Sequence, residues 1–180
     1  MTESGLLLDD QLCFALYSAS RAITGCYRAA LSATGLTYSQ YIVMLVLWEH
    51  DRTAAGDQAP GLSLRDLGER LSLDNGTLSP LVKRLAQLGL VTRQRSLADE
   101  RVLLVACTPA GRDLYQDAVA AQASVVEATG MTADSADELR AALDALTARL
   151  RDHTPPGPAV ADPAVADPAV AEHTAADRTG

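Results

Sequence analysis

Cys13 is the residue of this 180-residue chain best placed to do chemistry. It lies near the start of the first segment with helical periodicity, between the apolar residues Leu12 and Phe14. A cysteine in the first turn of a helix feels the positive end of the backbone dipole, although the preceding Asp9 and Asp10 oppose that effect. A thiolate in such a position is a nucleophile toward peroxides. The alternative is an inert, buried cysteine.

The tyrosines that follow Cys13 differ in whether they can reach its sulfur. Tyr17 follows Cys13 by four residues and shares its helix face. Tyr27 is 14 residues away, which is about 21 Å along a helix axis, so it cannot contact the sulfur of its own chain. A second copy of the helix, running antiparallel, would bring Tyr27 and then Tyr38 of one chain to Cys13 of the other.

The apolar periodicity predicts a mainly helical protein. A long amphipathic helix is expected over residues 9–36, capped by Asp9 or Asp10 and ended near Gly35. A second helix, apolar almost all round, is expected over residues 38–49. Its β-branched residues leave a strand as the alternative.

The next segments have the element order of a winged helix-turn-helix. A polar loop over residues 51–61 precedes a short helix, which a capping-box pattern at Ser63 and Asp66 starts. A second helix is expected over residues 77–88, and Pro80 must lie in its first turn or bend it.

Two strands are expected over residues 90–96 and 101–107, joined by a polar hairpin that we call the wing. Residues 62–112 form the whole module and contain eight basic and five acidic residues, a net charge of +3. The complete chain has a net charge of −8. A basic module in an acidic protein indicates DNA binding, and a solvated charged helical face is the alternative.

The second helix of such a module enters the major groove of DNA, so short polar side chains near its start are candidate readers of base edges. Basic residues further along and on the wing are candidate contacts to phosphates, with Arg101 as the minor-groove probe. Turn and cap roles are the alternative for Asn75 and Thr77. Solvated strand charges are the alternative for Arg93 and Arg95. The DNA-binding candidates are Asn75, Thr77, Ser79, Lys83, Arg84, Arg93, Arg95, Asp99 and Arg101.

Further helices are expected toward the C-terminus. Thr108 and Pro109 start a helix that runs to about residue 129, and a capping-box pattern at Ser135 opens another to about residue 152. Helices over residues 8–36 and 113–152 thus flank the winged helix on both sides, as in a dimerisation domain built from the two ends of a chain. A monomer with an extended core is the alternative.

Residues 1–152 are expected to form the folded protein. From residue 153 onward a Pro-Ala-Val-Ala-Asp repeat predicts a disordered tail, because proline interrupts helix and sheet every five residues. No segment resembles a signal peptide or a membrane span, and the three cysteines have no disulfide-framework spacing. We therefore expect a cytoplasmic protein that needs no metal or cofactor.

Four segments together resemble a known family. Residues 73–81 and 99–102 are similar to the recognition helix and wing of the MarR family of transcriptional regulators, and residues 12–18 with 36–41 resemble its organic-hydroperoxide-sensing OhrR branch. The resemblance covers about residues 8–114. It implies a homodimeric repressor that binds a pseudo-palindromic operator in double-stranded DNA and leaves it when a cysteine is oxidised by an organic hydroperoxide.

The resemblance also implies roles for individual residues. Cys13 corresponds to the redox sensor, and Tyr27 and Tyr38 correspond to the tyrosines of the partner subunit that donate hydrogen bonds to the reactive sulfur. Apolar side chains around this sulfur favour an organic hydroperoxide over a small polar one. The expected sensor pocket consists of Phe14, Leu16 and Tyr17.

Oxidised Cys13 needs a second thiol to escape irreversible oxidation. Cys26 follows it by 13 residues, about 20 Å along one helix, which excludes a disulfide within the chain but leaves one across a dimer open. Cys107 ends a strand expected to face the core. Some family members carry a resolving cysteine in a C-terminal helix, and this chain has none there, so a low-molecular-weight thiol is the favoured partner.

Other classes of function use part of this pattern. A MarR regulator that binds a phenolic ligand non-covalently shares the winged helix but does not need Cys13. A thiol peroxidase uses Cys13 without the basic wing, and a purely structural helical scaffold needs neither. The combination predicts a DNA-binding repressor rather than an enzyme.

Overall fold

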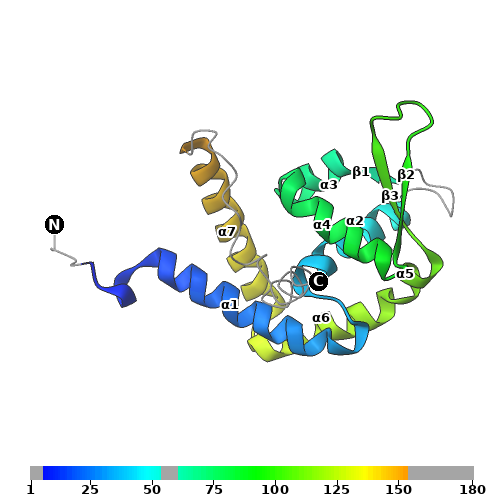
Figure 1. The fold of residues 1–180 in the computed structure, drawn as a ribbon. Coiled ribbons are helices and arrows are strands. Elements are labelled where there is room, and N and C mark those ends of the chain that lie inside the picture. Colours follow the sequence, from blue (N-terminus) through cyan, green and yellow to red (C-terminus); the bar gives the residue numbers. More distant parts are fainter. Residues whose placement is uncertain (1–5, 54–60, 154–180) are drawn as a thin grey trace, which may run out of the picture.

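A computed structural model describes residues 6–53 and 61–153 of the chain (Figure 1). The protein is mainly helical with one three-stranded antiparallel sheet, which confirms the expected fold class. The predicted disordered tail lies, apart from His153, outside the described residues. The elements are η1 Leu8–Asp10, α1 Leu12–Ala30, η2 Ser32–Thr34, α2 Tyr38–Thr53, β1 Leu62–Ser63, α3 Leu64–Leu71, α4 Asn75–Gln87, β2 Val91–Arg95, β3 Leu103–Cys107, α5 Pro109–Asp113, α6 Tyr115–Thr129 and α7 Ala133–His153.

The first helix is shorter than expected at both ends. Asp9 and Asp10 lie in the 3-10 turn η1, and Gln11, whose backbone is extended, precedes α1 without a side-chain cap. The predicted aspartate cap was therefore wrong. At the other end α1 stops at Ala30, and Gly35 ends the following 3-10 turn η2 in the left-handed region, with a φ of 69°.

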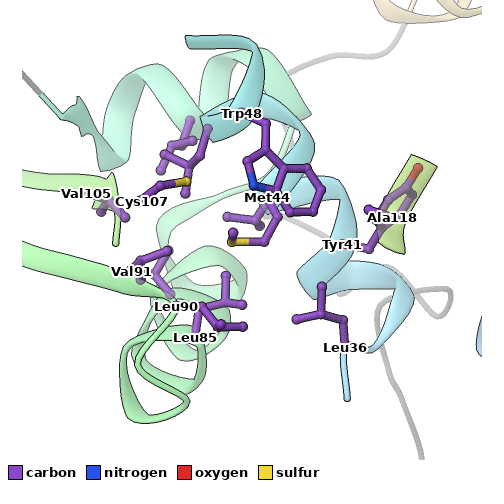
Figure 2. Packing of buried hydrophobic residues seen from close by; sticks show 14 of the residues in the cluster. Leu36, Tyr41, Met44, Trp48, Leu85, Leu90, Val91, Val105, Cys107 and Ala118 are labelled. Carbon is purple, nitrogen blue, oxygen red and sulfur yellow. The ribbon is translucent and has the colours of Figure 1, made fainter. Parts of the chain in front are cut away.

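The second helix, α2, occupies the centre of the protein. Its helical form was predicted correctly, and it continues into residues 51–53, which were expected to be loop. Thr37 and Gln40 form a capping box at its start: the Gln40 amide N–H donates to Thr37 Oγ1 at 3.3 Å, and the Thr37 amide N–H donates to Gln40 Oε1 at 3.0 Å. Met44 and Trp48 point from α2 into the hydrophobic core (Figure 2).

Helices α3 and α4 form the helix-turn-helix. The predicted capping box of α3 is confirmed, because Ser63 Oγ accepts from the Asp66 amide at 3.1 Å while the Asp66 carboxylate accepts from the Ser63 amide at 3.2 Å. Helix α4 begins at Asn75, two residues earlier than expected, because Asp74 caps it. Pro80 therefore lies in the second turn of α4 and not in the first.

The sheet has the strand order β1-β3-β2. Both expected strands are present as an antiparallel pair in which Val91 lies opposite Cys107 and Arg95 opposite Leu103. The edge strand β1 was not predicted, because two residues are too few for an alternating pattern. The β2–β3 hairpin, which is the expected wing, projects beyond the helices (Figure 1).

The helix predicted from Thr108 is divided into α5 and α6. Thr108 caps α5 as expected, since its Oγ1 accepts from the Gly111 amide at 3.0 Å. The division falls at Leu114. Near this division the indole Nε1 of Trp48 donates to the carbonyl of Gly111 at 2.8 Å, which joins α5 to α2.

Helix α7 begins at Ala133, because Thr132 Oγ1 accepts from the Ser135 amide at 3.3 Å and so caps the helix. The capping box predicted to open at Ser135 was therefore wrong. Helix α1 packs along α6 (Figure 1). No described residue of α7 is buried. The far end of α7 is tied to the helix-turn-helix, where Arg151 Nη2 donates to Ser72 Oγ at 2.5 Å.

Gly111 is a position at which any side chain must distort the fold. A Cβ there would lie 2.1 Å from the Leu90 carbonyl oxygen and 3.3 Å from Met44 Cε. We expect Gly111→Ala to lower the free energy of unfolding by about 2–4 kcal/mol through overpacking. Ala110→Ser, on the exposed side of the same helix, should change it by about 0.5 kcal/mol or less. Urea unfolding followed by circular dichroism measures both, and equal stabilities would contradict the expectation.

Candidate functional site

Cys13 is the second residue of α1 and is exposed. Its expected place in the first turn of a helix is therefore confirmed, and within the single chain its sulfur is not buried. Cys26 is also exposed, whereas Cys107 is buried. Two of the three thiols are thus accessible to a reagent in the isolated chain.

The three residues of the expected sensor pocket lie on α1 around Cys13. Phe14 and Leu16 are half-buried, and Tyr17 is 49% exposed. Arg21, which the sequence did not single out, donates from Nη1 to the Tyr17 hydroxyl at 3.0 Å, and its guanidinium carbon lies 5.6 Å from the centre of the Tyr17 ring. The Tyr17 side chain is therefore held by the next turn of α1 within this chain.

Tyr27 and Tyr38 belong to a cluster of three tyrosines between α1 and α2. The ring of Tyr27 is 5.1 Å from that of Tyr38 and 5.2 Å from that of Tyr41, measured between ring centres. Burial raises the pKa of Tyr38, with a smaller effect of Tyr27. Burial also raises the pKa of Tyr41, with further effects of the charge of Tyr27 and of a hydrogen bond with it. All three rings are thus packed together, and Tyr38 and Tyr41 stay protonated at neutral pH.

Tyr41 was not among the predicted site residues. It is almost fully buried and also contacts Trp48, with ring centres 6.5 Å apart. The signal that points to it is its spacing of three residues from Tyr38, which places both rings on one face of α2. Tyr41 therefore supports the two tyrosines that the family resemblance assigns as donors.

A single chain does not bring Cys13 to the tyrosine cluster. Both Cys13 and Tyr27 lie on α1, which is one continuous helix from Leu12 to Ala30. Their separation is consequently about 21 Å along the axis. The two halves of the predicted sensor site stand at opposite ends of α1.

The start of α4 carries the candidate base readers. Asp74 caps the helix by accepting from the Thr77 amide at 2.9 Å and from its hydroxyl at 3.1 Å. These hydrogen bonds, that of the Thr77 amide first, lower the pKa of the Asp74 carboxyl. The hydroxyl hydrogen of Thr77 is therefore held by the cap, and its lone pairs remain as acceptors. Asn75 is exposed, and Ser79 is half-buried.

The basic candidates are all exposed on α4 and the wing, namely Lys83, Arg84, Arg93, Arg95 and Arg101. Within the wing, Arg95 Nη1 donates to the carbonyl of Glu100 at 2.5 Å. The Asp99 carboxylate accepts from the Arg101 amide at 2.9 Å. Asp99 thus holds the backbone of Arg101 in place and orders the loop that carries it.

Cys107 lies in a different environment from the other thiols. Burial raises its pKa to about 12, and the negative charge of Asp51 adds to this effect while Arg112 opposes it. Asp51 and Arg112 form an ion pair at 2.8 Å beside it. This thiol is therefore neutral and shielded at physiological pH.

The described residues contain no group of histidine, cysteine and acidic side chains that could hold a metal ion. Among the described helices, none is both long and apolar enough to cross a membrane. What the structure does combine is a helix-turn-helix, a basic β-hairpin and an exposed cysteine on a separate long helix. These features define a winged-helix DNA-binding protein.

Comparison with known proteins identifies the family. A model described as "Transcriptional regulator SarA/Rot" matches residues 26–118. The organic hydroperoxide resistance transcriptional regulator of Bacillus subtilis is 38% identical over 76% of this chain and 86% of its own. The regulator TtmR of Methylorubrum extorquens is 46% identical over 81% of this chain and 68% of its own.

Solved structures agree with these relatives. AbfR of Staphylococcus epidermidis has a TM-score of 0.63 and 34% sequence identity, covering 81% of this chain and 92% of its own. The chain belongs to the MarR-like family of winged-helix transcriptional regulators that includes the SarA/Rot group. Its relatives are DNA-binding regulators rather than enzymes, and the resemblance noted in the sequence is confirmed.

The raised pKa of Cys107 has a measurable consequence. We expect iodoacetamide at pH 8 to leave Cys107 unmodified in the folded protein and to modify it in concentrated guanidinium chloride, as read by peptide mass spectrometry. The thiol of an unfolded chain has a pKa near 8.5, whereas burial raises the pKa of folded Cys107 to about 12. Between these two values the unfolded chain releases the thiol proton more readily than the folded chain, so the free energy of unfolding falls as the pH rises. Rapid modification of Cys107 in native buffer would contradict its burial.

Proposed function

We propose that this protein is a redox-sensing transcriptional repressor that leaves its operator when organic hydroperoxide oxidises Cys13. One observation carries the proposal: exposed Cys13 and the tyrosine cluster lie at opposite ends of one helix, about 21 Å apart. An antiparallel partner helix places the cluster of each chain beside the cysteine of the other. A site divided in this way requires a dimer.

The apolar surface of the terminal helices supports a homodimer. No residue of α1 or α7 is buried within the single chain. Soluble proteins seldom leave so many large apolar side chains of neighbouring helices in contact with water. The exposed apolar residues of α1, α6 and α7 include Leu12, Ile23, Val119, Val126, Leu139, Leu143 and Leu150. A second copy that covers these helices also completes the two sensor sites.

The proposed chemistry begins with the thiolate of Cys13 attacking the terminal oxygen of the hydroperoxide. The O–O bond breaks, the alkoxide leaves and takes up a proton to become an alcohol, and the sulfur is oxidised to a sulfenic acid. The hydroxyls of Tyr27 and Tyr38 from the partner chain donate hydrogen bonds to the sulfur in this arrangement. Half-buried Phe14 and Leu16 supply apolar contacts for the organic group.

A low-molecular-weight thiol is the proposed second reactant. It attacks the sulfenic sulfur, so that a mixed disulfide forms and water leaves. Cys107 is unsuited to this role because it is buried and its pKa is raised to about 12. Cys26 lies on the same helix as Cys13, about 20 Å away, and can react only across the dimer.

Relatives support the redox part of the proposal. AbfR has been solved in a reduced form bound to DNA, an overoxidised form bound to DNA and a disulfide form. The Bacillus subtilis relative is a regulator of organic hydroperoxide resistance. By this analogy the gene controlled here encodes a peroxide-detoxifying protein.

Replacement of Cys13 tests the sensor role. We expect Cys13→Ser to bind DNA as the wild type does but to remain bound in cumene hydroperoxide, whereas wild-type affinity falls by about tenfold or more, or 1.4 kcal/mol. Fluorescence anisotropy with a duplex selected from a random library by the wild-type protein measures this. Cys26→Ser, an exposed thiol on the same helix, is the matched control and should respond like the wild type.

Release of Cys13→Ser by hydroperoxide would refute the sensor role. Release of the same variant by a phenolic compound such as salicylate, with no response of the wild type to hydroperoxide, would favour a regulator with a non-covalent ligand.

Arg101 is the residue through which the wing is proposed to contact DNA. We expect Arg101→Ala to weaken binding and to reduce the slope of log K against log salt by about 0.9 for each wing on the duplex. A cation that enters the groove displaces counterions from the DNA, so the variant releases fewer of them when it binds. Anisotropy titrations over a range of salt concentrations measure this slope. An unchanged slope would remove Arg101 from the interface.

A further inference from the structure

Leu97 stands at the tip of the wing and has no packing role in the chain. Its relative exposure is 105%, the highest among the large apolar side chains of the described residues. It lies in the hairpin tip between β2 and β3, which projects beyond the helices (Figure 1). The core therefore does not explain an apolar side chain at this position.

The loop around Leu97 is ordered by its own hydrogen bonds. The Ser96 amide donates to the Val102 carbonyl at 2.9 Å, and the Ala98 amide donates to Ser96 Oγ at 3.2 Å. On the other side of the tip, the Val102 amide donates to the Asp99 carbonyl at 2.9 Å. These bonds use the polar groups next to Leu97 and order the backbone that carries it, so the backbone of the tip has less conformational freedom to lose on binding.

The charges beside Leu97 suit a nucleic acid. Arg93, Arg95 and Arg101 are exposed on the same hairpin. Two acidic residues of the tip, Asp99 and Glu100, partly offset the charge of these arginines. The Asp99 carboxylate accepts from the Arg101 amide at 2.9 Å. With three exposed arginines against two carboxylates, the hairpin keeps a positive balance around its apolar tip. Such a tip fits a surface with anionic rims and an apolar interior, as in the minor groove between its two phosphate backbones.

We propose that Leu97 enters the minor groove of the operator as an apolar wedge and selects against guanine beneath the wing. This inference rests on the proposed function, because it requires that the wing lie on DNA. Leucine is one of the apolar side chains that proteins insert into the minor groove. Guanine carries an exocyclic amino group there, and adenine and thymine do not, so an apolar side chain near the groove floor favours A·T pairs.

Substitution at Leu97 separates this contact from the electrostatic ones. We expect Leu97→Ala and Leu97→Ser to weaken binding by about tenfold for each contacting wing, which corresponds to about 1.4 kcal/mol. The salt slope should stay that of the wild type, because no cation is removed. Leu97→Met, which keeps the apolar area, is the matched control and should bind within about twofold of the wild type. The exposure of Leu97 means that these variants retain the fold.

Base analogues locate the contact in the minor groove. The probe is the selected duplex, with A·T, G·C or inosine·C pairs at the positions that the wing protects from hydroxyl radicals. Inosine·C has the major-groove face of G·C without the guanine amino group in the minor groove. We expect the wild type to bind A·T and inosine·C duplexes alike and G·C more weakly, and Leu97→Ser to lose this preference.

Two results would overturn the inference alone. In the first, the affinity of Leu97→Ser for the selected duplex lies within twofold of that of the wild type. In the second, the wild type binds duplexes with inosine·C and G·C pairs with equal affinity. A wild-type protein that selects no duplex at all would instead overturn the proposed function, together with the inference that rests on it.

Discussion

Burial of α2 is the constraint on which the remaining structure depends. Its start, fixed by the Thr37–Gln40 capping box, places Tyr38 and Tyr41 against Tyr27 of α1. Further along, α2 packs against α3, α4 and β3, and Trp48 reaches the Gly111 carbonyl. One apolar helix thus joins the tyrosine cluster at one end to the base of the wing at the other. A change at the tyrosines consequently has a packed route to the DNA-binding module.

The length of α1 sets a second constraint. A helix of 19 residues keeps Cys13 far from the tyrosines of its own chain, whatever the rotamers of these side chains. It also leaves an apolar surface that the single chain does not cover. In the proposed dimer, a second copy of the chain brings tyrosines to Cys13 and also covers this apolar surface. Sensing and dimerisation are therefore properties of one surface in the proposed function.

Much of the fold was predictable where the signal is local. The box at Ser63 and Asp66 and the cap at Thr108 were recognised, because capping depends on residues three apart in the sequence. The aspartate cap of α1 was wrong because Gln11 is extended and separates η1 from the helix. Strand β1 was missed because its two residues form a strand only by pairing with β3.

The candidate site likewise has features that the local sequence predicts and features that depend on tertiary contacts. Residue type and helix periodicity alone place Cys13 in the first turn of its helix and Tyr27 about 21 Å further along it, whereas the role of Tyr27 came from the family resemblance. The roles of Tyr41, Arg21 and Asp74 emerged only from the folded protein, since they depend on which rings, charges and amides meet in space. The core-facing strand pattern already predicted that Cys107 is buried, whereas the exposure of Cys13 became visible only in the structure, because the solvent around a thiol is set by distant segments of the chain.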